Sequence, residues 1–251
     1  MTLGEAPRIL QPAIPEDQRQ AASRPLPGIQ PLNGSDWLTV DVAYGPQLAE
    51  RARLLTHRRS AVLACEPCAE AAVCELLDEV LTLLEIRPDF EVGPTTVTRP
   101  DGVTVAVDRN APLDTLSRLV TEDLCLLQKK GDEHVLTAAL LCFPASWTLA
   151  EKIGKPLITL HAPVAEYNEA LARRVQRLFD GVKVGRPIWR ANLLKYDDPD
   201  LHQPRLESDR RPIAGDRSRY ERSERQVLWR LPKTGAVVFS IHTSVALIHQ
   251  P

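Results

Sequence analysis

One histidine of this chain stands in an apolar segment beside residues that suit a ligand site. His161 is followed by Pro163 and is preceded by Lys152 and Lys155. Proline fixes the backbone, a neutral imidazole binds iron, and lysines can hold carboxylates, so the combination is typical of an axial haem ligand with propionates nearby. Composition alone also allows a histidine that is hydrogen-bonded within the core. Both interpretations stay open at this point.

The cysteines offer a second kind of chemistry. Cys65 and Cys68 have the Cys-x-x-Cys spacing of redox and metal pairs, and Cys74 follows them. A closed zinc site needs four ligands, whereas the remaining thiols, Cys125 and Cys142, stand singly in apolar runs. Because five cysteines are an odd number in a chain with no export signal, we favour reduced thiols packed around a strand-to-helix junction over a zinc or iron–sulfur site.

Composition sets limits on the class of protein. The 251 residues are 43% hydrophobic and 25% charged, enough to bury the core of one large globular domain. A formal charge of −2 provides no overall basic field for nucleic acid or an anionic membrane. No apolar run approaches the roughly 20 residues that span a bilayer, and residues 1–20 lack the apolar core of a signal peptide. We therefore expect a cytoplasmic protein without nucleic-acid or membrane partners.

Several segments must position the candidate ligand. Ser60–Ala64 reads as a short strand, and apolar residues at helical spacing then predict a helix from Val73 to Leu84. The same spacing predicts helices over Pro112–Gln128 and Ala165–Phe179, with a buried strand over Val135–Phe143 between them. His161 thus belongs to a connection between a central strand and a helix, from which a ligand can be aimed into a pocket.

The remaining segments indicate an antiparallel sheet and an arm. Glu224–Leu231 and Ala236–Ile248 alternate as strands around a turn, which predicts a hairpin, and the alternating run Val103–Val107 suits a second hairpin. Tyr196–Tyr220 is too long for an ordinary connection, and it is either a solvated loop or a cover over a site. We expect residues 1–31 to form an irregular arm and residues 32–251 to form a single domain.

Short motifs in a fixed order resemble one protein family. They are listed as they stand in the chain: Leu124-Cys-Leu-Leu127, Leu141-Cys-Phe-Pro-Ala-Ser-Trp147, Glu151-Lys-Ile-Gly-Lys155, Leu160-His-Ala-Pro-Val164, Arg190-Ala-Asn192, Arg222-Ser-Glu-Arg-Gln226 and Arg230-Leu-Pro232. In this order the motifs are similar to those of the alpha-subunit family of haem-dependent oxidative N-demethylases. The resemblance implies an α+β fold similar to a PAS domain, with an antiparallel sheet, helices packed on one side and haem b held between them.

The resemblance also implies roles for individual residues. His161 matches the family's histidine and would be the proximal ligand of the iron. Glu224 would be the carboxylate that holds a substrate ammonium or relays a proton, and Tyr167 would donate a hydrogen bond beside bound oxygen. Four basic residues match family positions that could meet the propionates, each with a surface or structural ion pair as the alternative: Lys152, Lys155, Arg190 and Arg225.

The implied reaction is the oxidation of a small secondary amine such as dimethylamine by dioxygen, with release of formaldehyde and the primary amine. The sequence contains no Gly-x-Gly-x-x-Gly fingerprint and no four-cysteine set for a redox centre of its own. Electrons are therefore expected from an external NAD(P)H-dependent reductase or a ferredoxin-type protein. The alternative function is a non-catalytic haem-binding sensor or scaffold with the same PAS-like pocket.

Overall fold

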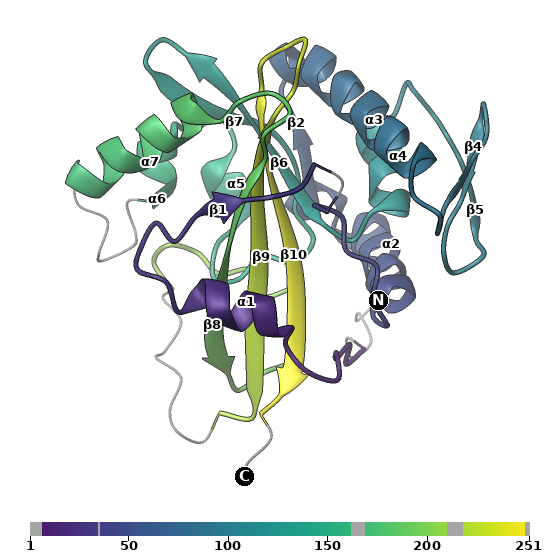
Figure 1. Cartoon of the computed structure of the whole chain (residues 1–251), viewed down its shortest axis with the longest axis horizontal. Coiled ribbons are helices and arrows are strands. Elements are labelled where there is room, and N and C mark those ends of the chain that lie inside the picture. Colours follow the sequence, from purple (N-terminus) through teal and green to yellow (C-terminus); the bar gives the residue numbers. More distant parts are fainter. Residues whose placement is uncertain (1–6, 35, 162–168, 210–217, 249–251) are drawn as a thin grey trace.

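Seven strands form the main sheet of the computed structural model, which describes residues 7–34, 36–161, 169–209 and 218–248 (Figure 1). The strand order is β1-β8-β9-β10-β6-β7-β2, and every neighbouring pair is antiparallel. The strands are β1 (Gln30–Pro31), β2 (Leu63–Cys65), β6 (Asp123–Lys130), β7 (Glu133–Leu140), β8 (Ile188–Tyr196), β9 (Tyr220–Arg230) and β10 (Val237–Leu247). The predicted antiparallel sheet and the α+β class are therefore confirmed.

Helices cover both faces of this sheet. They are α1 (Glu16–Ala22), α2 (Tyr44–Val62), α3 (Glu70–Glu85), α4 (Pro112–Leu119), α5 (Leu149–Lys152), α6 (Leu157–His161) and α7 (Glu169–Gly181). Along β6, Leu124 and Leu126 join a core cluster with α2–α4, whereas Cys125 and Leu127 join a second cluster with α5–α7. Figure 1 shows α7 on one side of the strands and α3 and α4 on the other. Helices pack on both sides, and not on one as expected, because the strands are apolar on both faces.

Two predicted boundaries were wrong. The helix expected over Pro112–Gln128 ends at Leu119, and the chain continues as β6. Asp123 fixes this change, since its carboxylate accepts the backbone N–H groups of Cys142 and Phe143 at 2.8 and 2.7 Å. The strand expected over Ser60–Ala64 begins only at Leu63, because α2 continues to Val62 and β2 follows directly.

Other predicted elements were confirmed. The helix expected from Val73 to Leu84 is α3, the buried strand is β7, and the C-terminal hairpin is β9 and β10. The run Val103–Val107 contains β5 (Thr104–Ala106), which pairs with β4 (Thr96–Thr98) in a small separate sheet that also includes β3 (Glu91–Val92). The helix expected over Ala165–Phe179 corresponds to α7, and residues 165–168 lie outside the described residues.

The segment expected to be an irregular arm contains α1 and β1. In Figure 1, α1 crosses β8 and β9, and the hydroxyl of Ser223 in β9 donates a 2.7 Å hydrogen bond to Gln18 of α1. Arg19 of α1 pairs with Glu221 of β9. The segment is thereby attached to the sheet. In the part of the chain that the structure describes, no helix has the length and apolar character to cross a bilayer.

Candidate functional site

Two of the sequence motifs lie side by side on β8 and β9. The strand register pairs Arg190 with Gln226 and Asn192 with Glu224. Because alternate residues of a strand share a face, these four side chains project from the same face of the sheet. Leu228, two residues beyond Gln226, belongs to the core cluster of α5–α7, which identifies the face. We call this the Glu224 face.

Three side chains hold the carboxylate of Glu224. Asn192 and Gln226 donate to its Oε2 at 3.0 and 3.2 Å, and the Nε of Arg222 lies 3.7 Å from its Oε1. Arg222 is almost fully buried, and its guanidinium donates to the carbonyls of Phe143 and Leu201 at 2.7 and 3.1 Å. Glu224 Oε1 therefore keeps acceptor capacity, while Oε2 is fixed by two amides.

Arg190 has a different environment from Arg222. Its Nε is buried and has no hydrogen-bond partner, and no ion pair of its guanidinium is found among the described residues. Burial lowers the pKa of Arg190 from its ordinary value, and the nearby charge of Glu224 opposes this shift. An arginine stays protonated even so, because its pKa lies far above neutrality. A positive charge with unused donors is thus present on the Glu224 face, and it suits an anionic group such as a carboxylate.

Apolar side chains border these polar groups. Phe179 and Val182, in α7 and directly after it, are buried in the same cluster as Leu228, and Phe239 of β10 packs partly buried against that cluster. Apolar side chains with a few placed polar groups are the usual composition of the lining of a cofactor site.

His161 is the last residue of α6, which contacts both β7 and α7. Its backbone is therefore placed among the elements of the Glu224 face, and its side chain lies outside what the structure describes. Tyr167 lies outside the described residues altogether. The predicted roles of both residues remain predictions.

Arg225 points away from Glu224. In the register it pairs with Ala191, and it therefore belongs to the opposite face, which we call the Arg225 face. Its guanidinium donates to the carbonyls of Asp36 and Trp37 at 2.6 and 3.4 Å and lies 5.1 Å from the ring centre of Trp189. Burial lowers the pKa of Arg225, opposed by the charges of Glu122, Asp17 and Asp36. Its donors attach the 36–37 segment to the sheet.

A buried polar network adjoins Arg225. The Nδ1 of His242 lies 3.2 Å from the hydroxyl of Thr121 and 3.6 Å from Glu122, and its Nε2 lies 3.8 Å from Asp41. Burial tends to raise the pKa of Asp41, but His242, the backbone N–H of Ala43 and the amide of Gln11 together outweigh burial and lower it. The sequence reasoning missed this network, because its members are far apart in the chain.

The two candidate lysines also separate. Lys152 is buried and forms a 2.5 Å ion pair with Glu207. Lys155 is exposed at the turn between α5 and α6, where its carbonyl accepts a hydrogen bond from Leu136 of β7. Among the described residues, neither lysine therefore contacts Arg190 or Glu224.

The three neighbouring cysteines lie where a strand-to-helix junction was expected. Cys65 ends β2, Cys68 lies in the short 3₁₀ turn Pro67–Ala69, and Cys74 lies in α3; all three are exposed. Burial, and then the neighbouring charge of Glu70, raise the pKa of Cys65, the opposite of what activates a redox thiol. Within the described ranges, no group of three or more His, Cys, Asp or Glu residues is arranged to hold a metal ion.

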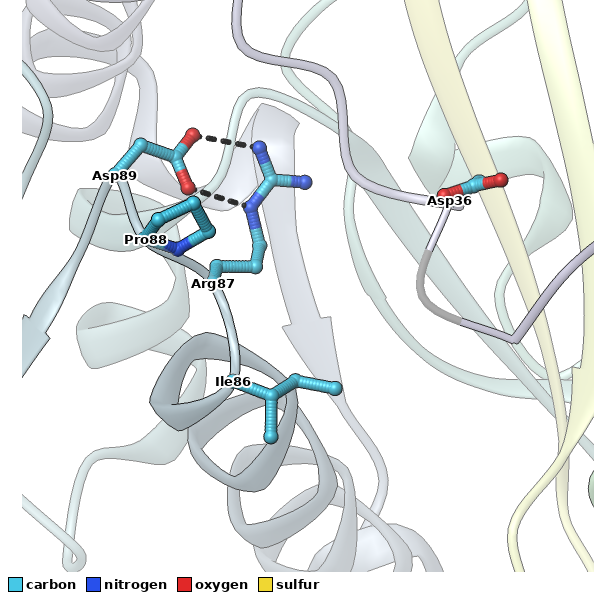
Figure 2. Close-up of a pocket in the computed structure, with 5 residues that line it drawn as sticks. All are labelled: Asp36, Ile86, Arg87, Pro88 and Asp89. Atoms are coloured by element: carbon cyan, nitrogen blue, oxygen red, sulfur yellow. Dashed lines mark hydrogen bonds and ion pairs between the residues drawn. The ribbon is translucent and has the colours of Figure 1, made fainter.

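A hollow of about 320 Å³ opens elsewhere, beyond the end of α3, and none of the predicted site residues lines it. Figure 2 shows that Arg87 forms two hydrogen bonds with Asp89, of 2.9 and 2.6 Å, and that Asp36 lies across the hollow. Arg87 also donates to the carbonyl of Leu38 at 3.1 Å. Its guanidinium is therefore already engaged, unlike that of Arg190.

Sequence reasoning missed three residues around Glu224, namely Asn192, Arg222 and Gln226. Arg222 and Gln226 lie two residues from Glu224, and Asn192 lies two residues from Arg190, so the period of a strand was a signal that could have identified them. A match to one protein-family model covers both motifs and most of the chain. Residues 28–250 match the family described as "Haem-dependent oxidative N-demethylase, alpha subunit-like", and the chain belongs to this family.

Proposed function

We propose that the Glu224 face binds haem b and that the protein oxidatively demethylates a small secondary amine such as dimethylamine. The observation that carries this proposal is that Arg190, whose Nε has no partner, shares one face of the sheet with the held carboxylate of Glu224. The guanidinium of Arg190 suits an anionic propionate, and the carboxylate of Glu224 suits a cationic amine. Family membership supports the same cofactor and reaction class.

The residues present fit a haem. The apolar side chains around Leu228 and Phe239 would contact the macrocycle. Arg190 would pair with a propionate, and His161 would be the proximal ligand. The order β8-β9-β10-β6-β7, with α5–α7 between β7 and β8 in sequence, supports the PAS-like arrangement. When bound, haem would supply the activation of dioxygen and the removal of electrons from the N-methyl group.

Glu224 would act on the amine through Oε1. Because Asn192 and Gln226 both donate to Oε2, the carboxylate cannot rotate freely, and Oε1 is the atom left to accept an N–H of the substrate ammonium. The guanidinium of Arg222, whose Nε lies 3.7 Å from Oε1, helps to hold the carboxylate in this position. Glu224 would therefore bind and orient the ammonium, and it would take up the proton that the amine must lose before oxidation.

The overall reaction needs electrons from outside the chain. Dimethylamine, dioxygen, two electrons and two protons balance to methylamine, formaldehyde and water. An NAD(P)H-dependent reductase or a ferredoxin-type protein would supply the two electrons.

The test is a spectral titration of the purified protein with haemin, followed by a formaldehyde assay with dimethylamine and a reductase. We expect a Soret band that shifts on reduction, is lost in His161→Ala, and is accompanied by formaldehyde release. A specific Soret band without formaldehyde release would instead support the non-catalytic sensor or scaffold. Absence of any specific band would overturn the haem site and the demethylase function together.

A further inference from the structure

The outer side of α7 and the turn that follows it carry a cluster of exposed bases. This cluster, which we call the α7 basic surface, consists of Arg174, Arg177, Lys183 and Arg186. None of the four forms an ion pair with another described residue. In the stretch 174–186 the only acid is Asp180, which is paired with Lys129 at 2.6 Å. Four bases less one acid give this stretch a charge of +3 in a chain whose formal charge is −2.

The turn after α7 has a defined shape. The backbone N–H of Arg186 donates to the carbonyl of Lys183 at 3.2 Å, which places the two bases side by side. Val184 lies between them and is 51% exposed. Arg230 of β9 donates to the carbonyls of Phe179 and Val182 at 2.7 Å each, and it anchors the end of the helix to the sheet. An exposed apolar tip between fixed charges is typical of a protein docking surface.

The position of this surface connects it with the Glu224 face. The inner side of α7 contributes Phe179 to the core cluster of that face, and Val182 follows directly after the helix. Figure 1 shows α7 as the outermost element on its side of the sheet. Since a helix with its side chains is about 10 Å thick, a protein seated on α7 would be separated from the Glu224 face by a single layer.

We propose that the α7 basic surface docks an acidic electron-transfer protein, an inference that rests on the proposed haem function. Each encounter would move one electron from the reduced partner to ferric haem, which becomes ferrous while the partner is oxidised. Charge complementarity selects an acidic partner, because exposed bases that form no ion pair with another described residue attract an anionic surface over a distance of about a Debye length. Electron-transfer complexes are small and short-lived, which suits a surface made of one helix and one turn.

The experiment measures haem reduction by a reduced, acidic, plant-type [2Fe–2S] ferredoxin in stopped-flow, at several ionic strengths. The variant is Lys183→Glu/Arg186→Glu, and the matched control is Arg8→Glu/Arg24→Glu, two exposed arginines outside the surface. We expect the second-order rate constant to fall about tenfold or more in the first variant, with a weaker salt dependence. The control should stay within about twofold of the wild type. Equal rate constants in the two double variants would overturn the proposal.

A second readout separates this proposal from the haem function. Dithionite, a small reductant that needs no docking surface, should reduce haem equally fast in all three proteins. The same ferredoxin should also bind the haem-free protein in calorimetry at low salt, and the Lys183→Glu/Arg186→Glu variant should weaken that binding about tenfold. If the wild type binds no haem, the proposed function is wrong. If the wild type binds haem but binds the ferredoxin no better than the variant does, only the docking proposal is wrong.

Discussion

The two faces of β8–β10 differ in whether their charged side chains have hydrogen-bond partners among the described residues. On the Arg225 face, Arg225 donates to two carbonyls, and Asp41 and Glu122 flank His242. On the Glu224 face, the Nε of Arg190 is buried without a partner, although Glu224 is held by amides on both sides. Arg225 on one face attaches the 36–37 segment to the sheet, whereas Arg190 on the other face has an Nε without a partner.

Neighbouring residues can therefore have unrelated roles. Glu224 and Arg225 are adjacent in the chain and belong to one family-like motif, yet the strand sends them to opposite faces. Arg190 and Arg225 both matched basic positions of the family, but only Arg190 shares a face with Glu224. A motif that lies along a strand can thus contain a candidate site residue and a residue with a structural role at the same time.

The largest effect on stability is expected on the Arg225 face. Replacing Arg225 by Met should lower the free energy of unfolding by about 2–4 kcal/mol, because the carbonyls of Asp36 and Trp37 lose charged donors in a buried place. Arg190→Met should change it by less than about 1 kcal/mol, since the Nε has no partner to lose. Urea unfolding monitored by tryptophan fluorescence measures the free energy of unfolding of both variants. Equal losses in the two variants would remove the distinction between the faces.

The next effect concerns activity. Glu224→Gln keeps an acceptor oxygen for Asn192 and Gln226 but removes the charge that binds the ammonium. We expect the rate of formaldehyde release from dimethylamine to fall about 100-fold, with the haem spectrum unchanged. The control is Glu221→Gln, a carboxylate of β9 whose partner is Arg19 on the other face. Wild-type turnover by Glu224→Gln would show that this carboxylate takes no part in the reaction.

The smallest effect is a dependence of stability on pH. His242 lowers the pKa of Asp41 in the folded protein, so the stabilisation is complete above the unfolded value of about 3.9 and is lost as the pH falls through the folded value. Asp41→Asn should flatten the decline of thermal stability below about pH 4. Melting curves between pH 3 and 6 would show this difference. An unaltered pH profile in Asp41→Asn would mean that the pKa of Asp41 is not lowered in the folded protein.

The fold was partly predictable from the sequence, and particular residues show why. The period of β9 separates Val227 and Trp229 from Gln226 and Leu228, so the hairpin and the division of its faces could be predicted. The run from Leu113 to Leu127 fits helical spacing, but its last four residues, Leu124 to Leu127, belong to a strand that is apolar and buried on both faces. Local spacing cannot distinguish these two cases.

The candidate site was less predictable than the fold. The sequence identified Glu224 and Arg190 as candidates, but it could not give the register that pairs Asn192 with Glu224, because β8 and β9 are joined by a long connection. It also could not show that Arg225 and Lys152 have protein partners, since Asp36 and Glu207 are distant in the chain. Contacts of this kind depend on tertiary structure alone.

The affinity for haem tests the distinction between the faces most directly. Haemin is titrated into wild type, Arg190→Met and Arg225→Met at a temperature at which circular dichroism shows all three to be folded, and the Soret band gives each Kd. We expect about tenfold weaker haem binding by Arg190→Met, because a propionate loses its charged partner. We expect an unchanged Kd for Arg225→Met. Wild-type affinity in Arg190→Met, or a larger loss in Arg225→Met, would contradict a haem site on the Glu224 face.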